Sequence, residues 1–212
     1  MFKCFKSGWV VTLIAVLSTL SASAAEGIAK ANETALSIRE LKNEVAKTRL
    51  QLTTTVYTLQ DLVKNPKTDL LPQFKAFTNS VPVLVLQANE VQKHAKLMDS
   101  NSEAYLSAWD KQIGDVSSEI LRDIAATRKS RLKKDLTKVS KKLDSAARRL
   151  NPLMAKLEDV VKFLSVDLTK SGLSTIKHLV WRTAQEAKTC ERSINALSEE
   201  LDQVAKSLDA RA

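Results

Sequence analysis

Residues 132–164 read LKKDLTKVSKKLDSAARRLNPLMAKLEDVVKFL, and their apolar positions recur in alternating steps of four and three residues. This spacing keeps a narrow apolar stripe on one face of a helix. The stripe consists of Leu132, Leu136, Val139, Leu143, Ala146, Leu150, Leu153, Leu157, Val160 and Leu164. Because such a long stripe is unfavourable in water, other helices must cover it. The segment therefore predicts one long helix, over about 118–168, inside a helical bundle.

Three other stretches repeat the alternation and predict helices over about 28–64, 72–113 and 173–208. We call the apolar stripe of each helix its seam. The first seam is Ile38, Leu41, Val45, Thr48, Leu52, Thr55, Leu59 and Leu62. The second is Phe74, Phe77, Val81, Leu84, Ala88, Val91, Ala95, Met98, Ser102, Tyr105 and Trp109. The last is Leu173, Ile176, Val180, Thr183, Ala187, Cys190, Ile194, Leu197, Leu201, Val204 and Leu208.

Breaks between these stretches are short, so consecutive helices should run antiparallel. The first helix should stop at Asn65, because Pro66 follows it, and Gly114 and Thr169–Gly172 mark the other breaks. Pro82 and Pro152 lie inside seams that keep their phase, so we expect each to bend its helix without ending it. The prediction is an all-α fold: one elongated antiparallel four-helix bundle or coiled coil, up-down-up-down, over residues 25–212.

The N-terminal residues 1–24 have the order of a secretory signal peptide. Lys3 and Lys6 precede a mostly apolar run, Trp9–Leu20, and Ala22-Ser23-Ala24 offers a cleavage site after Ala24. The run is shorter than the roughly 20 apolar residues that span a bilayer. We therefore expect an exported protein, periplasmic or secreted, that is soluble after cleavage. Cleavage removes two lysines and no acid, so the formal charge falls from +9 to +7.

Cysteine content restricts the ways in which the mature chain could be stabilised. After cleavage only Cys190 remains, so no intrachain disulfide can form and stability must come from packing. Thr48 and Thr55 occupy seam positions of the first helix. They indicate either looser packing there or polar groups that fix the register of the helices.

The chain resembles a bacterial domain-of-unknown-function family of exported, coiled-coil-rich helical proteins, many of them lipid-anchored. The similarity rests on the export signal, the Ala104–Trp109 segment (AYLSAW), the basic helix, Leu150–Leu157 (LNPLMAKL) and the apolar residues through Leu168. It covers nearly the whole mature chain. Cys4 is not beside the cleavage site, so this chain lacks the lipid-attachment cysteine of many relatives. The resemblance implies fold and compartment, and it supplies no functional residues.

A basic run between Arg128 and Arg149 is the main candidate for a site. It holds ten lysines and arginines against two aspartates. One interpretation is a surface for polyanions, such as anionic lipid or cell-wall polymer. The other is a solvated helix face whose cations pair with acids on neighbouring helices. In that case Arg128–Lys134 would face Asp99 and Glu103, and Lys138, Lys141 and Lys142 would lie across from Glu199, Glu200 and Asp202. The candidate contacts are Arg128, Lys129, Lys133, Lys134, Arg148 and Arg149. Nucleic acid is an unlikely ligand, because export separates the chain from it and no aromatic residues interleave with the cations.

The sequence offers no catalytic set, cofactor-binding motif or metal-ligand cluster. His94 and His178 lie off the seams and should face solvent, and Cys190 should lie in the core. The aromatic residues at helical spacing should be core. We therefore expect a non-enzymatic structural or interaction protein of the bacterial cell envelope, working through self-association or a protein partner. The alternative is a protein that binds polyanions or anionic membrane surfaces through residues 128–149.

Overall fold

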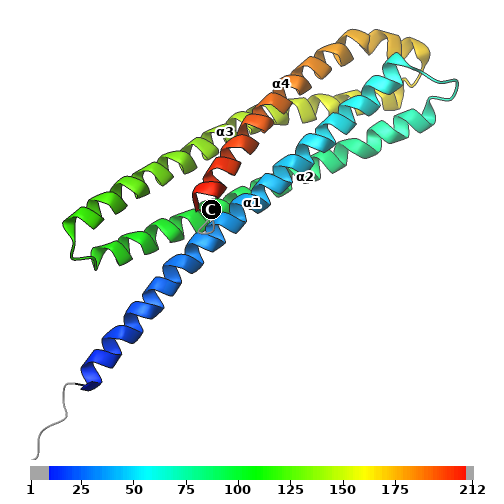
Figure 1. Ribbon diagram of the computed structural model, residues 1–212. Coiled ribbons are helices and arrows are strands. Elements are labelled where there is room, and N and C mark those ends of the chain that lie inside the picture. The colour runs from blue at the N-terminus through cyan, green and yellow to red at the C-terminus, as the bar shows by residue number, and fades with distance from the viewer. Residues whose placement is uncertain (1–9, 209–212) are drawn as a thin grey trace, which may run out of the picture.

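The computed structural model describes the backbone of residues 10–208 and the side chains of residues 25–208. This part of the chain forms four helices and no strand, which confirms the all-α prediction: α1 (Val10–Lys64), α2 (Leu71–Gly114), α3 (Glu119–Val166) and α4 (Lys170–Leu208). At about 1.5 Å per residue the helices are roughly 60 to 80 Å long. Figure 1 shows them side by side, with short connections at the two ends of the bundle.

Successive helices run in opposite directions and close into a four-helix bundle (Figure 1). α1 lies beside α2 and α4, and α3 lies beside α4 and, less closely, beside α2. Over the described residues the two diagonal pairs, α1 with α3 and α2 with α4, make no close backbone approach. This arrangement is the predicted up-down-up-down order.

The predicted seams form the core of this bundle. Every seam residue of α1 and α4 is buried, including Cys190, and so is every seam residue of α3 except the half-buried Leu143. In α2 the seam is buried from Phe77 to Ser102 apart from the half-buried Val91. The alternation of three and four residues therefore identified the packed face of each helix correctly.

Some predicted helix limits are wrong. α1 begins at Val10, whereas we expected a start near Ile28. The apolar and alanine-rich run before residue 28 favours helix and contains only Gly27 as a weak breaker. Residues 10–24 of the predicted signal peptide are thus the first part of α1, and residues 1–9 lie outside the described part. α4 begins at Lys170, not at Leu173.

The third connection is shorter than predicted because Thr169 caps α4. Its hydroxyl oxygen accepts a hydrogen bond from the Gly172 backbone N–H at 3.0 Å, and the hydroxyl donates to Asp167 at 2.7 Å. Gly172 is buried in the first turn of α4, where a Cβ atom would lie 2.5 Å from the Asp167 carbonyl oxygen. Glycine is needed here because the Asp167 backbone comes so close to it. Gly172 lies inside α4, so our prediction that it helps to end a helix is wrong.

Gln73 closes the connection between α1 and α2. Its buried side-chain amide donates to the Asp61 carboxylate at 2.7 Å and to the Asn65 carbonyl at 3.1 Å. Its carbonyl oxygen accepts from the Lys67 backbone N–H at 3.1 Å. The hydrogen bonds from Gln73 and Asn65 lower the pKa of Asp61. One buried side chain thus ties the end of α1 to the start of α2.

Both internal prolines lie inside continuous helices, as predicted. Beside Pro82, the Ser80 carbonyl accepts hydrogen bonds from two side chains of α1: Gln51 at 3.0 Å and Thr55 at 3.2 Å. The Thr58 and Ser80 hydroxyls lie 3.3 Å apart. α1 therefore carries a polar cluster at the level where α2 contains its proline.

The two seam threonines of α1 have different roles. Thr48 donates only to Glu44 in its own helix, at 2.9 Å. Thr55 is fully buried and donates both to Gln51 in its own helix and to Ser80 in α2. The register interpretation therefore fits Thr55, while Thr48 only satisfies its own hydroxyl group.

Candidate polyanion-binding surface

The basic run lies on α3, in its middle and N-terminal half, and most of its cations face solvent. Five of the six candidate contacts are exposed: Arg128, Lys133, Lys134, Arg148 and Arg149. The sixth, Lys129, is half-buried and forms an ion pair with Asp110 of α2. We call the segment from Arg128 to Arg149 the basic segment.

Three of the ten cations in the basic segment are paired with carboxylates. Besides Lys129, these are Lys138, which binds Asp135 in its own helix at 2.7 Å, and Lys142, which binds Glu200 of α4 at 2.7 Å. Lys142 also donates to the Ala196 carbonyl at 3.1 Å. The other seven cations have no ion pair within the described residues. Neighbouring acids therefore neutralise only part of the segment.

The pairing between α2 and α3 differs from our expectation. We expected Arg128–Lys134 to face Asp99 and Glu103, but the partner from α2 is Asp110, farther along the helix. Asp99 lies instead near Asp144, and burial, Glu103 and Asp144 together raise its pKa. The expectation assumed a register displaced by about two helical turns, because sequence alone does not fix the length of the connecting turn.

The pairing between α3 and α4 matches our expectation for Lys142 and Glu200. Asp202, which we placed in the same group, binds Lys42 of α1 at 2.6 Å and Lys206 of its own helix at 3.2 Å. These hydrogen bonds lower the pKa of Asp202. Asp202 therefore fastens α4 to α1 and contributes no counter-charge to the basic segment.

The exposed cations do not converge on one point. Arg128 lines a groove of about 180 Å³ with Tyr105 and Trp109 of α2 and with the end of α4. Lys133 lies on the α2 side of the same helix, in a second groove that also contains Trp109. Arg148 and Arg149 follow four to five turns later. This distribution suits an extended polymer or a lipid surface better than a small anion.

The prediction that the aromatic residues of α2 are core is correct for Phe77 and in part for Phe74 and Tyr105, which are half-buried and pack against the core. Phe77 is fully buried, whereas Tyr105 and Trp109 are half-buried and meet edge to face with their ring centroids 5.7 Å apart. The Trp109 indole nitrogen is buried without a hydrogen-bond acceptor in the described part of the molecule. Burial raises the pKa of Tyr105, and Arg128 opposes that shift. Tyr105 and Trp109 thus form the aromatic part of the groove that Arg128 lines.

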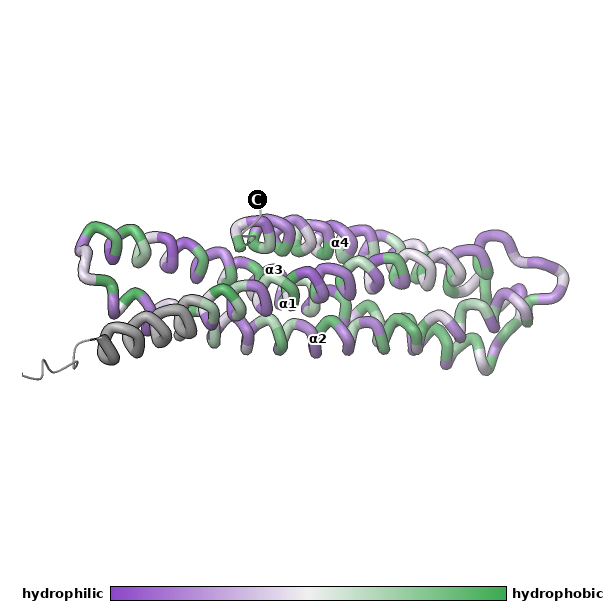
Figure 2. Tube along the Cα trace, turned by 60° about the horizontal axis from the view of Figure 1, so that its bottom comes forward, coloured by the Kyte–Doolittle hydropathy of each residue, from purple (hydrophilic) through white to green (hydrophobic). Residues whose placement is uncertain are grey.

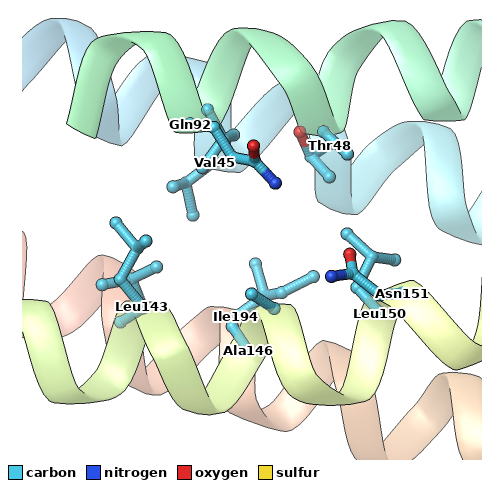
Figure 3. Close-up of a pocket in the computed structure, with 12 residues that line it drawn as sticks. Val45, Thr48, Gln92, Leu143, Ala146, Leu150, Asn151 and Ile194 are labelled. Carbon is cyan, nitrogen blue, oxygen red and sulfur yellow. The ribbon is translucent and has the colours of Figure 1, made fainter. Parts of the chain in front are cut away.

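A small cavity interrupts the core at the middle of the bundle (Figure 3). Its volume is about 40 Å³, and side chains of all four helices line it, among them Val45, Val91, Leu143 and Ile194. Ala88 and Ala146 leave the space because their side chains are short. Thr48, Gln92 and Asn151 are its polar neighbours. The cavity is about the size of one or two water molecules, far below the volume of a ligand site.

The histidines and the cysteine were predicted with mixed success. His178 is exposed and stacks on Trp181, and Cys190 is fully buried, as predicted. Burial raises the pKa of the Cys190 thiol to about 11, Glu191 adds to the shift and Arg149 opposes it. His94, expected in solvent, is half-buried between Glu40 and Glu90, at 3.7 and 4.0 Å. Its position between α1 and α2 could not be read from a seam defined by apolar residues.

No group of three or more histidine, cysteine, aspartate or glutamate side chains is arranged to hold a metal ion in residues 25–208. Among the described helices, none is both long and apolar enough to cross a membrane.

Comparison with known proteins gives one match. Residues 21–210 match the family described as "Protein of unknown function (DUF2959)". No curated protein and no solved structure matches the chain.

Proposed function

The chain belongs to the DUF2959 family of unknown function, as its resemblance to a domain-of-unknown-function family led us to expect, and from this premise we propose that it is an exported, non-enzymatic structural or interaction protein of the bacterial cell envelope. The observation that carries the proposal is the long bundle itself. Four helices bury continuous seams against one another, and a rod of this kind suits a spacer or scaffold that binds other proteins along its helical surfaces.

Ion pairs and hydrogen bonds between the helices support a rigid rod. Lys142–Glu200 joins α3 to α4 and Lys42–Asp202 joins α1 to α4. Arg49 of α1 donates to Asn195 of α4 at 3.0 Å, and Thr53 donates to Glu191 at 2.8 Å. A spacer needs such fixed geometry because bending would change the distance that it holds.

Export is tested by the fate of the N-terminus. Expressed in a Gram-negative host, the protein should be released by osmotic shock, and its N-terminal residue by mass spectrometry should be Ala25. Leu13→Arg combined with Leu17→Arg should retain the full-length chain inside the cell, because charges interrupt the apolar run. A wild-type chain that keeps Met1 and stays in the cytoplasm would contradict the proposal.

The interaction role is tested in the envelope itself. Cross-linking of intact cells should trap the protein in defined complexes, with itself or with envelope proteins. Lys177→Glu is the control variant and should leave these complexes unchanged, because this exposed residue lies outside the basic segment. A chain that cross-links only internally would argue against a scaffold.

One observation favours a second function. Seven cations of the basic segment are without an ion pair among the described residues, so the segment is suited to an anionic membrane surface or a cell-wall polymer. The purified chain should co-sediment with phosphatidylglycerol vesicles at low salt and dissociate at high salt. Charge reversal of Lys133, Lys134, Arg148 and Arg149 should abolish binding. Binding that is insensitive to salt would reject this function.

A further inference from the structure

In the part of the chain that the structure describes, the end of the bundle where α2 meets α3 has only three helices, because α4 stops short of it. α4 ends at Leu208, which lines a groove with Arg131 of α3, while α3 begins twelve residues before Arg131, at Glu119. Figure 2 shows that the end of α4 lies well short of the connection between α2 and α3. The first three turns of α3 therefore lack the neighbour that covers the rest of this helix.

The uncovered face is the continuation of the face that α4 covers. On α3, Lys142 binds Glu200 of α4, and Leu121 precedes Lys142 by 21 residues, which is three heptads. On α1, Lys42 binds Asp202 of α4, and Ile28 precedes Lys42 by 14 residues, which is two heptads. Positions a whole number of heptads apart share a helix face. Ile28 and Leu121 therefore border the space into which α4 does not extend.

This space has an apolar lining. Ile28 is 61% exposed, Ile120 73%, Leu121 56% and Ile124 53%. Ile28 also lies at the right level along the rod: Gly27 packs against Gln112 of α2, and Asp110 of α2 pairs with Lys129 of α3. Ile28 is thus level with Lys129, about two turns beyond Leu121. An apolar helix face of this kind is expected to be covered.

The charges around this apolar face indicate that a helix covers it and not a membrane. Residues 110–124 contain four acids and two bases, a net charge of −2 that an anionic lipid surface would repel. Residues 128–134 contain five bases and no acid. An acidic turn followed by a basic turn is complementary to an antiparallel copy of itself, because opposite charges then meet at both ends.

We propose that the first three turns of α3 from a second copy of this chain occupy the space, in a reciprocal, two-fold symmetric contact. A two-fold axis near Ala125 places Glu119 of one copy level with Arg131 of the other. It also places Leu121 of one copy level with Lys129, and hence with Ile28, of the other. The uncovered stretch, residues 119–130, is about 18 Å long, and the second copy supplies a helix of the same length.

This contact names one partner for the proposed interaction role. It rests on the proposed function only because it assumes that the rod acts through its helical surfaces. Two rods joined at these ends give an assembly almost twice the length of one. The contact is isologous, so it closes at two copies and does not propagate.

Sedimentation equilibrium of the full chain tests the proposal. From about 1 to about 100 µM the protein should shift from monomer to dimer. Leu121→Glu and Ile124→Glu should each weaken dimerisation at least tenfold, with unchanged helix content by circular dichroism. The matched control is Val166→Glu at the opposite end of the bundle, an apolar residue that is 90% exposed, and it should dimerise as the wild type does.

A charge exchange tests the antiparallel geometry. Glu119→Lys with Asp123→Lys in one copy, and Arg128→Glu with Arg131→Glu in another, should each weaken self-association at least tenfold. Mixing the two copies should restore dimers. A wild-type chain that stays monomeric, an equal effect of Val166→Glu, or a mixture that stays monomeric overturns the proposal. Capture of the monomer by phosphatidylglycerol vesicles through Ile124 overturns it in favour of lipid, and each failure leaves the export result unaffected.

Discussion

Thr55 provides the most specific test of how the bundle sets its register. Thr55→Val keeps the shape of the side chain and removes the hydroxyl that donates to Ser80 in α2 at 3.2 Å. Thr48→Val is the matched control, because it removes a hydroxyl from the same seam that donates only within α1. Both side chains are buried, at 0% and 3% exposure, so burial does not distinguish the two substitutions.

The size of the effect follows from the remaining partners of the Ser80 carbonyl. After Thr55→Val the carbonyl keeps the Gln51 amide at 3.0 Å, so the loss is that of one ordinary hydrogen bond, about 1 kcal/mol of unfolding free energy. Thr48→Val should change stability by less than about 0.5 kcal/mol, since no group outside α1 loses a partner. Adding Gln51→Leu to Thr55→Val removes both donors from α1 and should cost about 1 to 3 kcal/mol more.

Guanidinium unfolding followed by circular dichroism measures these differences, and thermal unfolding should show a decrease in Tm of about 2 to 4 °C per kcal/mol. The double variant should lose more than the sum of its single variants, because only it removes both α1 donors from the carbonyl. Equal effects of Thr48→Val and Thr55→Val would refute the reasoning. They would mean that both threonines are simply polar groups tolerated in a loose seam.

Three further outcomes follow from packing and burial. Leu157→Ala should cost about 2 to 5 kcal/mol of unfolding free energy because the side chain is fully buried. Leu50→Ala, at a 68% exposed position, should change the unfolding free energy by less than about 0.5 kcal/mol. Equal losses would contradict the buried and exposed faces assigned to these helices. Gly172→Ala should destabilise the protein because its Cβ meets a backbone oxygen at 2.5 Å, while Gly114→Ala meets nothing within 4 Å and should be neutral or stabilising by up to about 1 kcal/mol; denaturant midpoints decide this. Cys190, with its pKa raised to about 11, should react with a thiol reagent at pH 8 roughly a hundredfold more slowly than in the unfolded chain, and the rate should increase as pH rises toward that pKa; fast labelling of the native chain would place the thiol outside the core.

The sequence predicted those features that repeat along a helix. Seam positions such as Leu157 and Cys190 follow from spacing alone, because a residue's place in a heptad determines which face it occupies. Both internal prolines were read correctly for the same reason: the pattern keeps its phase on either side of Pro82 and Pro152. The family resemblance rested on particular segments, such as Ala104–Trp109 and Leu150–Leu157, which can be recognised without knowing how the helices pack.

Features that depend on the relative position of two helices were not predicted. The partner of Lys129 is Asp110 because the turn between α2 and α3 fixes their offset, and the sequence leaves that offset open by a turn or more. The place of His94 between Glu40 and Glu90 has the same cause. The uncovered end was also missed, since each seam was read without comparing where neighbouring helices stop.

The central claim is that the four helices of one chain close on one another in this order. A zero-length carbodiimide cross-linker joins a lysine to a carboxylate in direct contact, and the bundle offers Lys42–Asp202, Lys142–Glu200 and Lys129–Asp110. We predict that mass spectrometry of a mixture of unlabelled and ¹⁵N-labelled protein finds all three links, each with both peptides from the same isotopic species. A Lys42–Asp202 link that combines the two species, or the absence of this link, would show that α4 does not close on α1 of its own chain.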